Sequence, residues 1–243
     1  MQTGQFEPTE TVLLRHLLSR ADLFVNVGAN FGYYICMARQ LGIRSVAVEP
    51  VPINVETLRR NIAVNSWDDG FTIHPVACGE TAGDCEIFGE GSGASLIPGW
   101  ARNPSALCHT VPVVRLDDLL KDEKISGKSV FLVDVEGFEL EVLRGAQKIL
   151  TSPDRPIWML ESGLTDHRPE GNLNTKFLDV VTLVQEHGYI VLNAQDPSVE
   201  VTLGLIEDSI AQGVDQLGTH NFVLIPKEYD RSLLTGALLD KSV

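Results

Sequence analysis

Apolar runs alternate along the chain with stretches that have the period of a helix. Each run is nearly continuous in apolar and β-branched residues, as is typical of strands covered on both faces. Between them, segments 52–65, 139–150 and 177–188 place apolar side chains three or four positions apart, which predicts amphipathic helices. The predicted strands are residues 23–27, 45–49, 71–76, 129–135, 157–161, 189–193 and 221–226.

This alternation predicts an α/β fold, with a doubly wound parallel sheet between two layers of helices. A further helix, from about Thr9 to Ser19, leads into the first strand. No internal repeat and no linker divides the chain, so we expect one domain over residues 1–243. Within it, residues 1–20 form the N-terminal helical segment, residues 21–226 form the core and residues 227–243 form a C-terminal tail.

Three stretches lose this periodicity: residues 79–112, 161–174 and 196–218. The first is dense in glycine and proline, which predicts a long excursion over the edge of the sheet with one short strand at Cys85 to Phe88. Trp100 within it is either a core residue or a platform for a sugar ring. Long loops in compact domains usually carry function, so we expect these stretches to shape the substrate site.

Composition excludes several classes of protein. Hydrophobic residues make up 44% of the 243 residues, which is ample for a core and excludes a disordered chain. The formal net charge of −14 disfavours nucleic acid as a partner, because its phosphates would be repelled. No apolar run approaches membrane-spanning length and no secretory leader is evident, so we expect a cytoplasmic protein without membrane contacts.

Cysteine and histidine spacing does not match a metal site. No CxxC pair, HExxH or HxH occurs, so we expect no metal ion and interpret the cysteines as free thiols. The four cysteines are Cys36, Cys78, Cys85 and Cys108.

The segment VNVGANFGYY, residues 25–34, carries the first chemical signal. Gly28 and Gly32 follow the first strand and precede a helix, where glycines allow a ligand to approach backbone N–H groups. Glu49 closes the second strand, 21 residues after Gly28, where a carboxylate accepts hydrogen bonds from a ribose diol. Together these residues predict an adenosine-containing ligand.

The glycine loop favours a small cofactor over a dinucleotide. A dinucleotide fingerprint needs a third small residue, so that the helix can approach the sheet beneath the pyrophosphate. This loop instead continues with Tyr33, Tyr34 and Ile35. S-adenosylmethionine fits this loop better than NAD, and a nicotinamide-dependent oxidoreductase is kept as the alternative.

Motifs distributed in order along residues 20–226 resemble the FkbM-type methyltransferases. They include FVNVGANFGYY, VAVEPVPINVETLRRNIAVN, HPVACGE, VVRLDDLL, PIWMLE and HNFVLIP, and DVEGFELEVLRGA is the most specific of them. The resemblance implies S-adenosylmethionine as cofactor. It also implies the Rossmann-like class I methyltransferase fold, with a mostly parallel seven-stranded sheet whose last strand is antiparallel.

The resemblance also implies a set of cofactor contacts. Asn26 departs from the family pattern, which usually has an acid there to hold the cofactor's amino group. An asparagine oxygen still accepts a hydrogen bond, but the change keeps a non-catalytic adenosyl-binding module as a third interpretation. The implied contacts are Asn26, Gly28, Ala29, Asn30, Gly32, Tyr33, Glu49, Pro50, Val76, Ala77 and Asp134.

Three carboxylates are candidates for catalysis on an alcohol acceptor, which must lose a proton during methyl transfer. Asp134 is either that base or a partner of the cofactor's ammonium group. Glu136 is either a base or a cap for the helix that follows. Glu161 closes a strand and either orients or deprotonates the acceptor. By resemblance, we expect O-methylation of a small molecule, a sugar or a glycan.

The apolar segment SLLTGALL, residues 232–239, is unusual for a C-terminal tail. Docking on the chain's own core and docking on a second copy, as a homodimer, are both compatible with its sequence.

Overall fold

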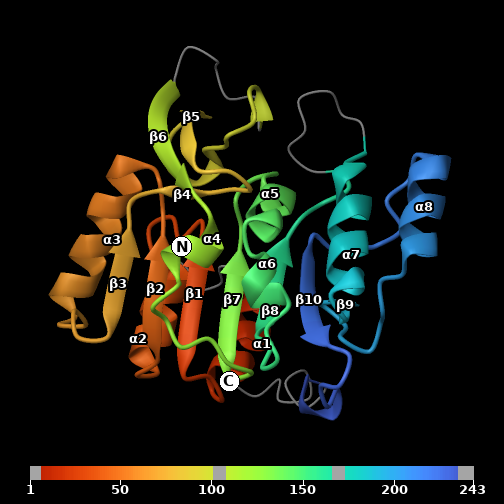
Figure 1. Cartoon of the computed structure of the whole chain (residues 1–243), viewed down its shortest axis with the longest axis horizontal. Coiled ribbons are helices and arrows are strands. Elements are labelled where there is room, and N and C mark those ends of the chain that lie inside the picture. The colour runs from red at the N-terminus through yellow and green to blue at the C-terminus, as the bar shows by residue number, and fades with distance from the viewer. Residues whose placement is uncertain (1–6, 101–107, 166–172, 235–243) are drawn as a thin grey trace.

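A seven-stranded sheet forms the centre of the computed structural model, which describes residues 7–100, 108–165 and 173–234 (Figure 1). The strand order is β3-β2-β1-β7-β8-β10-β9. The first five of these strands run parallel, and β10 is antiparallel to both of its neighbours. The strands are β1 Leu23–Val27, β2 Arg44–Val48, β3 Phe71–His74, β7 Ser129–Val133, β8 Ile157–Glu161, β9 Tyr189–Asn193 and β10 Asn221–Pro226.

The predicted fold class, with its antiparallel last strand, is confirmed by this topology. Strands 23–27, 157–161, 189–193 and 221–226 match their predicted ranges. The other three predicted ranges run past the observed carboxyl ends of their strands. The residues concerned, among them Glu49 and Asp134, belong to the loops that leave the sheet there, and an apolar pattern does not show where a hydrogen-bonded ladder stops.

Helices cover both faces of the sheet. Helices α1 to α3 bury their apolar residues on one face, and α4 to α8 bury theirs on the other. Figure 1 shows α4 to α7 in front of the sheet and α1 behind it. The helices are α1 Pro8–Leu18, α2 Tyr33–Gln40, α3 Pro52–Val64, α4 Leu116–Leu119, α5 Glu139–Arg144, α6 Gln147–Leu150, α7 Lys176–Glu186 and α8 Leu203–Gln212.

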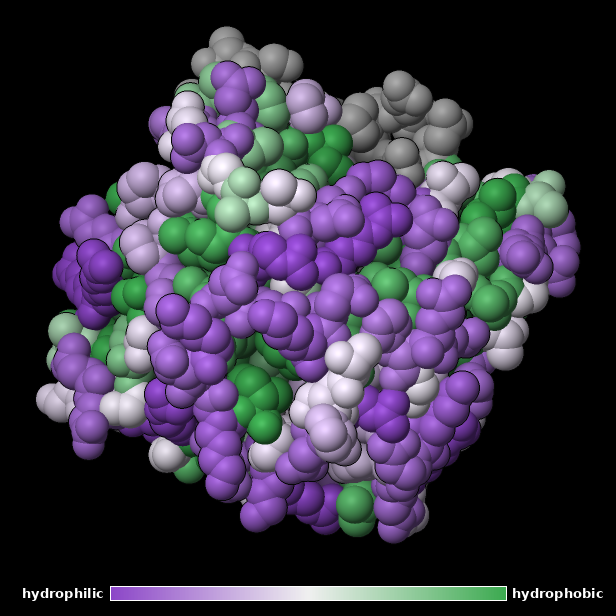
Figure 2. Space-filling view, viewed as in Figure 1, coloured by the Kyte–Doolittle hydropathy of each residue, from purple (hydrophilic) through white to green (hydrophobic). Residues whose placement is uncertain are grey.

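The outer surface of the α4 to α7 layer is mostly hydrophilic, with small apolar patches between polar side chains (Figure 2). This follows from helices that turn one apolar stripe to the sheet and expose the opposite face. None of the helices that the structure describes has both the length and the apolar composition needed to span a bilayer.

The stretch 79–112 contains more regular structure than the sequence predicted. A second sheet of order β4-β6-β5 lies above the carboxyl ends of the central strands (Figure 1). The pattern indicated only part of β5, and β6 was missed because Pro112 interrupts an alternation in which Val111 and Val113 are buried. The strands are β4 Ala77–Cys78, β5 Gly83–Phe88 and β6 Cys108–Val114.

Two helical predictions were also wrong. The stretch 196–218 was predicted to be irregular, yet it contains α8, whose N-cap Thr202 accepts a hydrogen bond from Leu205 N at 3.3 Å. The single helix predicted over 139–150 is instead two helices, α5 and α6, separated at Gly145. A Cβ at Gly145 would lie 2.2 Å from the carbonyl oxygen of Gly79, so this position faces the backbone of another segment.

The C-terminal tail is described as far as Leu234. The side chain of Leu234 is fully buried in the layer that contains α1, and His16 Nε2 lies 2.6 Å from the carbonyl oxygen of Leu233. The rest of the apolar segment, residues 235–239, lies outside the described residues.

Candidate functional site

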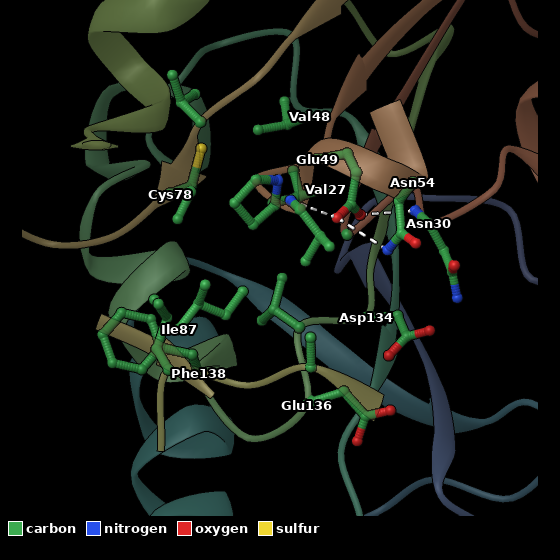
Figure 3. A pocket seen from close by; sticks show the side chains of 18 of the residues that line it. Val27, Asn30, Val48, Glu49, Asn54, Cys78, Ile87, Asp134, Glu136 and Phe138 are labelled. Atoms are coloured by element: carbon green, nitrogen blue, oxygen red, sulfur yellow. Dashed lines mark hydrogen bonds between the residues drawn. The ribbon is translucent and has the colours of Figure 1, made fainter. Parts of the chain in front are cut away.

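A cavity is lined by residues at the ends of β1, β2 and β7 and by Cys78 and Ile87 of the small sheet (Figure 3). In a doubly wound sheet this edge is where loops diverge and ligands bind. About 560 Å³ of space inside the cavity is not filled by protein atoms, and part of that space is open to solvent. Of the predicted cofactor contacts, its lining contains Gly28, Asn30, Glu49, Pro50, Val76, Ala77 and Asp134.

The two loop glycines are required by the protein's own packing. Gly28 has φ +84°, and a Cβ there would lie 1.7 Å from the carbonyl oxygen of Asp134. Gly32 has φ +87°, and a Cβ there would lie 2.0 Å from Leu58 Cδ1 on α3. The sequence suggested that a ligand excludes side chains from both positions. The nearest atoms are instead those of β7's carboxyl end and of α3.

Glu49 joins the loop after β1 to the start of α3. Its side chain is nearly buried, with 4% of the residue exposed. One carboxylate oxygen accepts from Asn30 N at 2.7 Å, and the other accepts from Val51 N at 2.9 Å and from Asn54 Nδ2 at 3.2 Å (Figure 3). Burial raises the pKa of Glu49, and the hydrogen bonds from Val51 and Asn30 oppose that shift. A carboxylate can accept about four hydrogen bonds, so one position is left for a ligand.

Asn54 was not predicted from the sequence, yet it lines the same cavity. Its Nδ2 also donates to the carbonyl oxygen of Gly91 at 3.1 Å, whereas its buried Oδ1 has no partner among the described residues. A buried acceptor without a partner costs about 1–3 kcal/mol, which a ligand's donor would recover.

The cavity therefore suits an adenosine group. Around the acceptors of Glu49 and Asn54, the walls are formed by the apolar side chains of Val76, Ala77, Ile87, Leu96 and Phe138. Hydroxyl donors of a ribose and the flat apolar faces of a purine match these two kinds of lining.

A second cavity adjoins the first and shares Asp134 and Glu136 with it. All three predicted catalytic carboxylates line this second cavity, so the structure brings Asp134, Glu136 and Glu161 together. The rest of its lining is Trp100, Gly137, Glu139, Ser162, Gly163, Asn174 and His220.

The carboxylates of the second cavity hold their protons unusually strongly. Burial, with the charges of Glu161 and Glu136 nearby, raises the pKa of Asp134 well above its ordinary value. Burial and neighbouring carboxylates, Glu7 first among them, raise the pKa of Glu161 to about 8. Burial raises the pKa of Glu139 to about 7, against hydrogen bonds from backbone N–H groups that lower it. Perturbed carboxyl groups in a cleft are typical of functional sites.

The turn after β7 is held by the small sheet's connecting segment. Glu136 has φ +53°, a left-handed conformation that is unfavourable for a residue with a side chain. Its carbonyl oxygen accepts from Ser95 Oγ at 2.7 Å, and its carboxylate accepts from Trp100 Nε1 at 2.6 Å.

The interpretation of Glu136 as a helix cap is wrong, because α5 has Phe138 at its N-cap without any side-chain cap bond. Glu139 instead accepts from Gly137 N at 2.9 Å.

Four predicted cofactor contacts lie outside the lining of both cavities. Asn26 is buried within β1, in register with Ala47 of β2 and Leu132 of β7. Ala29 is buried in the core layer with α1, and Gly32 meets Leu58 as described above. The Tyr33 hydroxyl lies 3.4 Å from Thr11 Oγ1 of α1. The proposed roles of these four residues stay predictions.

Within residues 7–100, 108–165 and 173–234, no three His, Cys, Asp or Glu side chains come together in an arrangement that would hold a metal ion.

The chain is similar to known proteins in sequence and in fold. The family model for the methyltransferase FkbM domain matches residues 26–191. No match was found among curated protein sequences. Methyltransferase FkbM from Methylobacillus flagellatus superposes with a TM-score of 0.50 and 16% identity, over 84% of this chain and 43% of that one. The chain thus spans less than half the length of that protein.

Two further structures have the same fold with TM-scores below 0.5. The O-methyltransferase from Bacillus cereus in complex with SAH has a TM-score of 0.47 and 13% identity, over 90% of this chain and 80% of that one. Precorrin-6y C5,15-methyltransferase from Geobacter metallireducens has a TM-score of 0.44 and 15% identity, over 75% and 71% of the two chains. At such identities a likeness concerns the fold alone.

Proposed function

The chain belongs to the FkbM family of methyltransferases, and from this premise we propose that it methylates a hydroxyl group on a small molecule, a sugar or a glycan. S-adenosylmethionine is the cofactor. When bound, it supplies an electrophilic methyl group on a sulfonium. The chain's own residues must then hold the cofactor, align the acceptor and remove its proton.

The first cavity supports the assignment of the cofactor's binding residues. Glu49 and Asn54 would accept from the ribose hydroxyls, since each has an acceptor position left. Val76 and Ala77 would flank the adenine, and the backbone around Gly28 would lie beside the methionine portion.

The observation that carries the proposal is the junction of the two cavities at Asp134 and Glu136. A cofactor in the first cavity and an acceptor in the second would meet there, beside two carboxylates. We assign the general base to Asp134 because its raised pKa brings proton uptake closer to neutral pH. Glu161 lines the second cavity without lining the first, which suits contact with the acceptor.

The negative charge of the protein argues against one class of acceptor, the nucleic acids. A formal net charge of −14 and the carboxylates of the second cavity disfavour a nucleic-acid acceptor, whose phosphates would be repelled. A cytoplasmic location remains part of the proposal.

Two titrations and one assay test this function. We expect calorimetry to detect binding of S-adenosylmethionine and none of NADH. A panel of sugars and small alcohols should then yield S-adenosylhomocysteine with at least one acceptor. Binding of NADH in preference to S-adenosylmethionine would contradict the proposal.

A further inference from the structure

The second cavity is lined by a cluster of acidic side chains. Four carboxylate side chains line it, and among its described lining residues there is no lysine or arginine. Glu10 on α1 and Glu7 at the N-cap of that helix lie close enough to raise the pKa of Glu161 further. The carboxylates in the lining are Asp134, Glu136, Glu139 and Glu161.

Asp134 and Glu161 differ from carboxylates elsewhere in the fold. Within the part of the chain that the structure describes, neither side chain makes a hydrogen bond or an ion pair, and the charges that act on both are those of other carboxylates. By contrast, Glu141 on the same helix as Glu139 pairs with Lys176 at 2.6 Å. Carboxylates with little access to water are normally paired or hydrogen-bonded, so Asp134 and Glu161 lack a counter-charge among the described residues.

Ser162 is an independent sign of a polar ligand in this cavity. The residue follows Glu161, lines the same cavity and is 5% exposed. Its buried Oγ has no hydrogen-bond partner among the described residues. Leaving a buried hydroxyl unpaired costs about 1–3 kcal/mol, and a polar group of a ligand would remove that cost.

An organic cation satisfies these groups better than a neutral ligand. The carboxylates that the structure describes are not grouped in an arrangement that would hold a metal ion. A cofactor in the first cavity would place its positive charge near Asp134, which lines both cavities. Glu161 would then still lack a partner. A neutral polyol offers hydroxyl groups to Ser162 but no charge to Glu161.

Building on the function proposed above, we propose that the second cavity binds an acceptor with a protonated amine beside the hydroxyl to be methylated, as in an amino sugar. The ammonium group pairs with Glu161 and lies within reach of Ser162. The hydroxyl lies at the junction, beside Asp134. Amine recognition thus places the hydroxyl against the base.

Three probes that differ at one position test this proposal: methyl glucosaminide, its N-acetyl derivative and methyl glucoside. Calorimetry with S-adenosylhomocysteine present should show the amine binding at least about tenfold tighter than the other two, a difference of about 1.4 kcal/mol. The Glu161→Gln protein should lose this preference. The Glu207→Gln protein, which carries the same charge change on the exposed side of α8, should keep it.

Proton release provides a second readout. A bound ammonium lowers the pKa of Glu161 from about 8, so amine binding at pH 7.5 should release protons. The carboxyl groups that act on Glu161 are those of Asp134, Glu136, Glu139, Glu7 and Glu10. Tyr34 on α2 also interacts with Glu161, and His220 lines the same cavity. Repeating the titration in buffers of different ionisation enthalpy measures the release.

Equal affinity for the three probes, or a preference that survives Glu161→Gln, overturns the proposal. Failure of all three to bind while S-adenosylhomocysteine binds also overturns it, and leaves the proposed function standing. If S-adenosylhomocysteine itself does not bind, the proposed function fails. The affinities of the three probes are then measured in the protein without cofactor. Tighter binding of the amine there supports a cation site, and equal affinities overturn it.

Discussion

The carbonyl oxygen of Asp134 faces the α-carbon of Gly28 so closely that a Cβ at position 28 would come within 1.7 Å of it. The neighbouring backbones are joined, because Asp134 N donates to the carbonyl oxygen of Val27 at 3.0 Å. The glycine loop that borders the cofactor cavity and the turn that carries the proposed base are therefore a single packed unit. A change at either position is expected to move both.

The first prediction concerns Gly28→Ala. The added methyl group meets main-chain atoms that cannot rotate away, in a backbone conformation with φ +84°. We expect a loss of about 3 kcal/mol or more in the free energy of unfolding. The matched control is Gly42→Ala, which has φ +77° but nothing within 4 Å of the added Cβ, and it should lose about 1 kcal/mol. Equal losses in denaturant unfolding would contradict the packing argument.

The sequence predicted the central sheet well for a physical reason. Strands buried on both faces are mostly apolar, so β1, β8, β9 and β10 are visible as nearly continuous apolar runs. The small sheet is exposed on one side and spans a segment rich in glycine and proline, so β6 gave no comparable signal. The sequence likewise does not show that Gly28 is required because its α-carbon packs against the carbonyl oxygen of Asp134, about a hundred residues further along the chain.

The second prediction concerns Glu49→Gln. The substitution keeps the shape but places an amide N–H₂ among N–H donors and removes an acceptor for ribose hydroxyls. Calorimetry should show S-adenosylmethionine binding at least about tenfold more weakly, the loss expected when a charged hydrogen bond of about 1.5–3 kcal/mol is removed. The control is Glu56→Gln, an exposed position on α3. Unchanged affinity in the Glu49 variant would show that the ribose lies elsewhere.

The third prediction concerns the dependence of the protein's stability on pH, which we attribute to Glu161. The pKa of Glu161 is about 8 in the folded protein and about 4.3 in an unfolded chain. Between these values the folded state keeps a proton that the unfolded state has released, so stability falls as pH rises from about 4.3 to about 8. Glu161→Gln should make this decline in melting temperature shallower and raise the melting temperature at pH 8.5 by about 2–4 °C. A variant with the parent's pH profile would exclude a buried, proton-binding Glu161.

The fourth prediction concerns the contact between Trp100 and Glu136. Trp100→Phe keeps an aromatic ring over Gly137 but removes the Nε1 donor to the Glu136 carboxylate. We expect kcat to fall about tenfold, because a turn in a left-handed conformation loses one of its supports, with a smaller change in the cofactor's Kd. Trp158→Phe, in the core and away from both cavities, is the control for lost stability. An unaltered kcat in the Trp100 variant would remove Trp100 as a positioning residue.

The candidate site was predictable only where it is local in sequence. Glu49 and Asp134 directly follow strands, and their position at the sheet's edge follows from that alone. Asn54 could have been suspected from its place in the first turn after Glu49. The roles of Trp100 and Glu139 could not have been predicted, because they depend on the turn at Glu136. That turn is held by Trp100, which lies 36 residues away in the chain.

The most direct measurement is a crystal structure of the protein with S-adenosylhomocysteine. The account predicts ribose hydroxyls within hydrogen-bonding distance of Glu49, adenine between Val76 and Phe138, and the sulfur directed at the junction beside Asp134. A ligand bound at another edge of the sheet, with the cavity at Gly28 and Glu49 left to solvent, would contradict it.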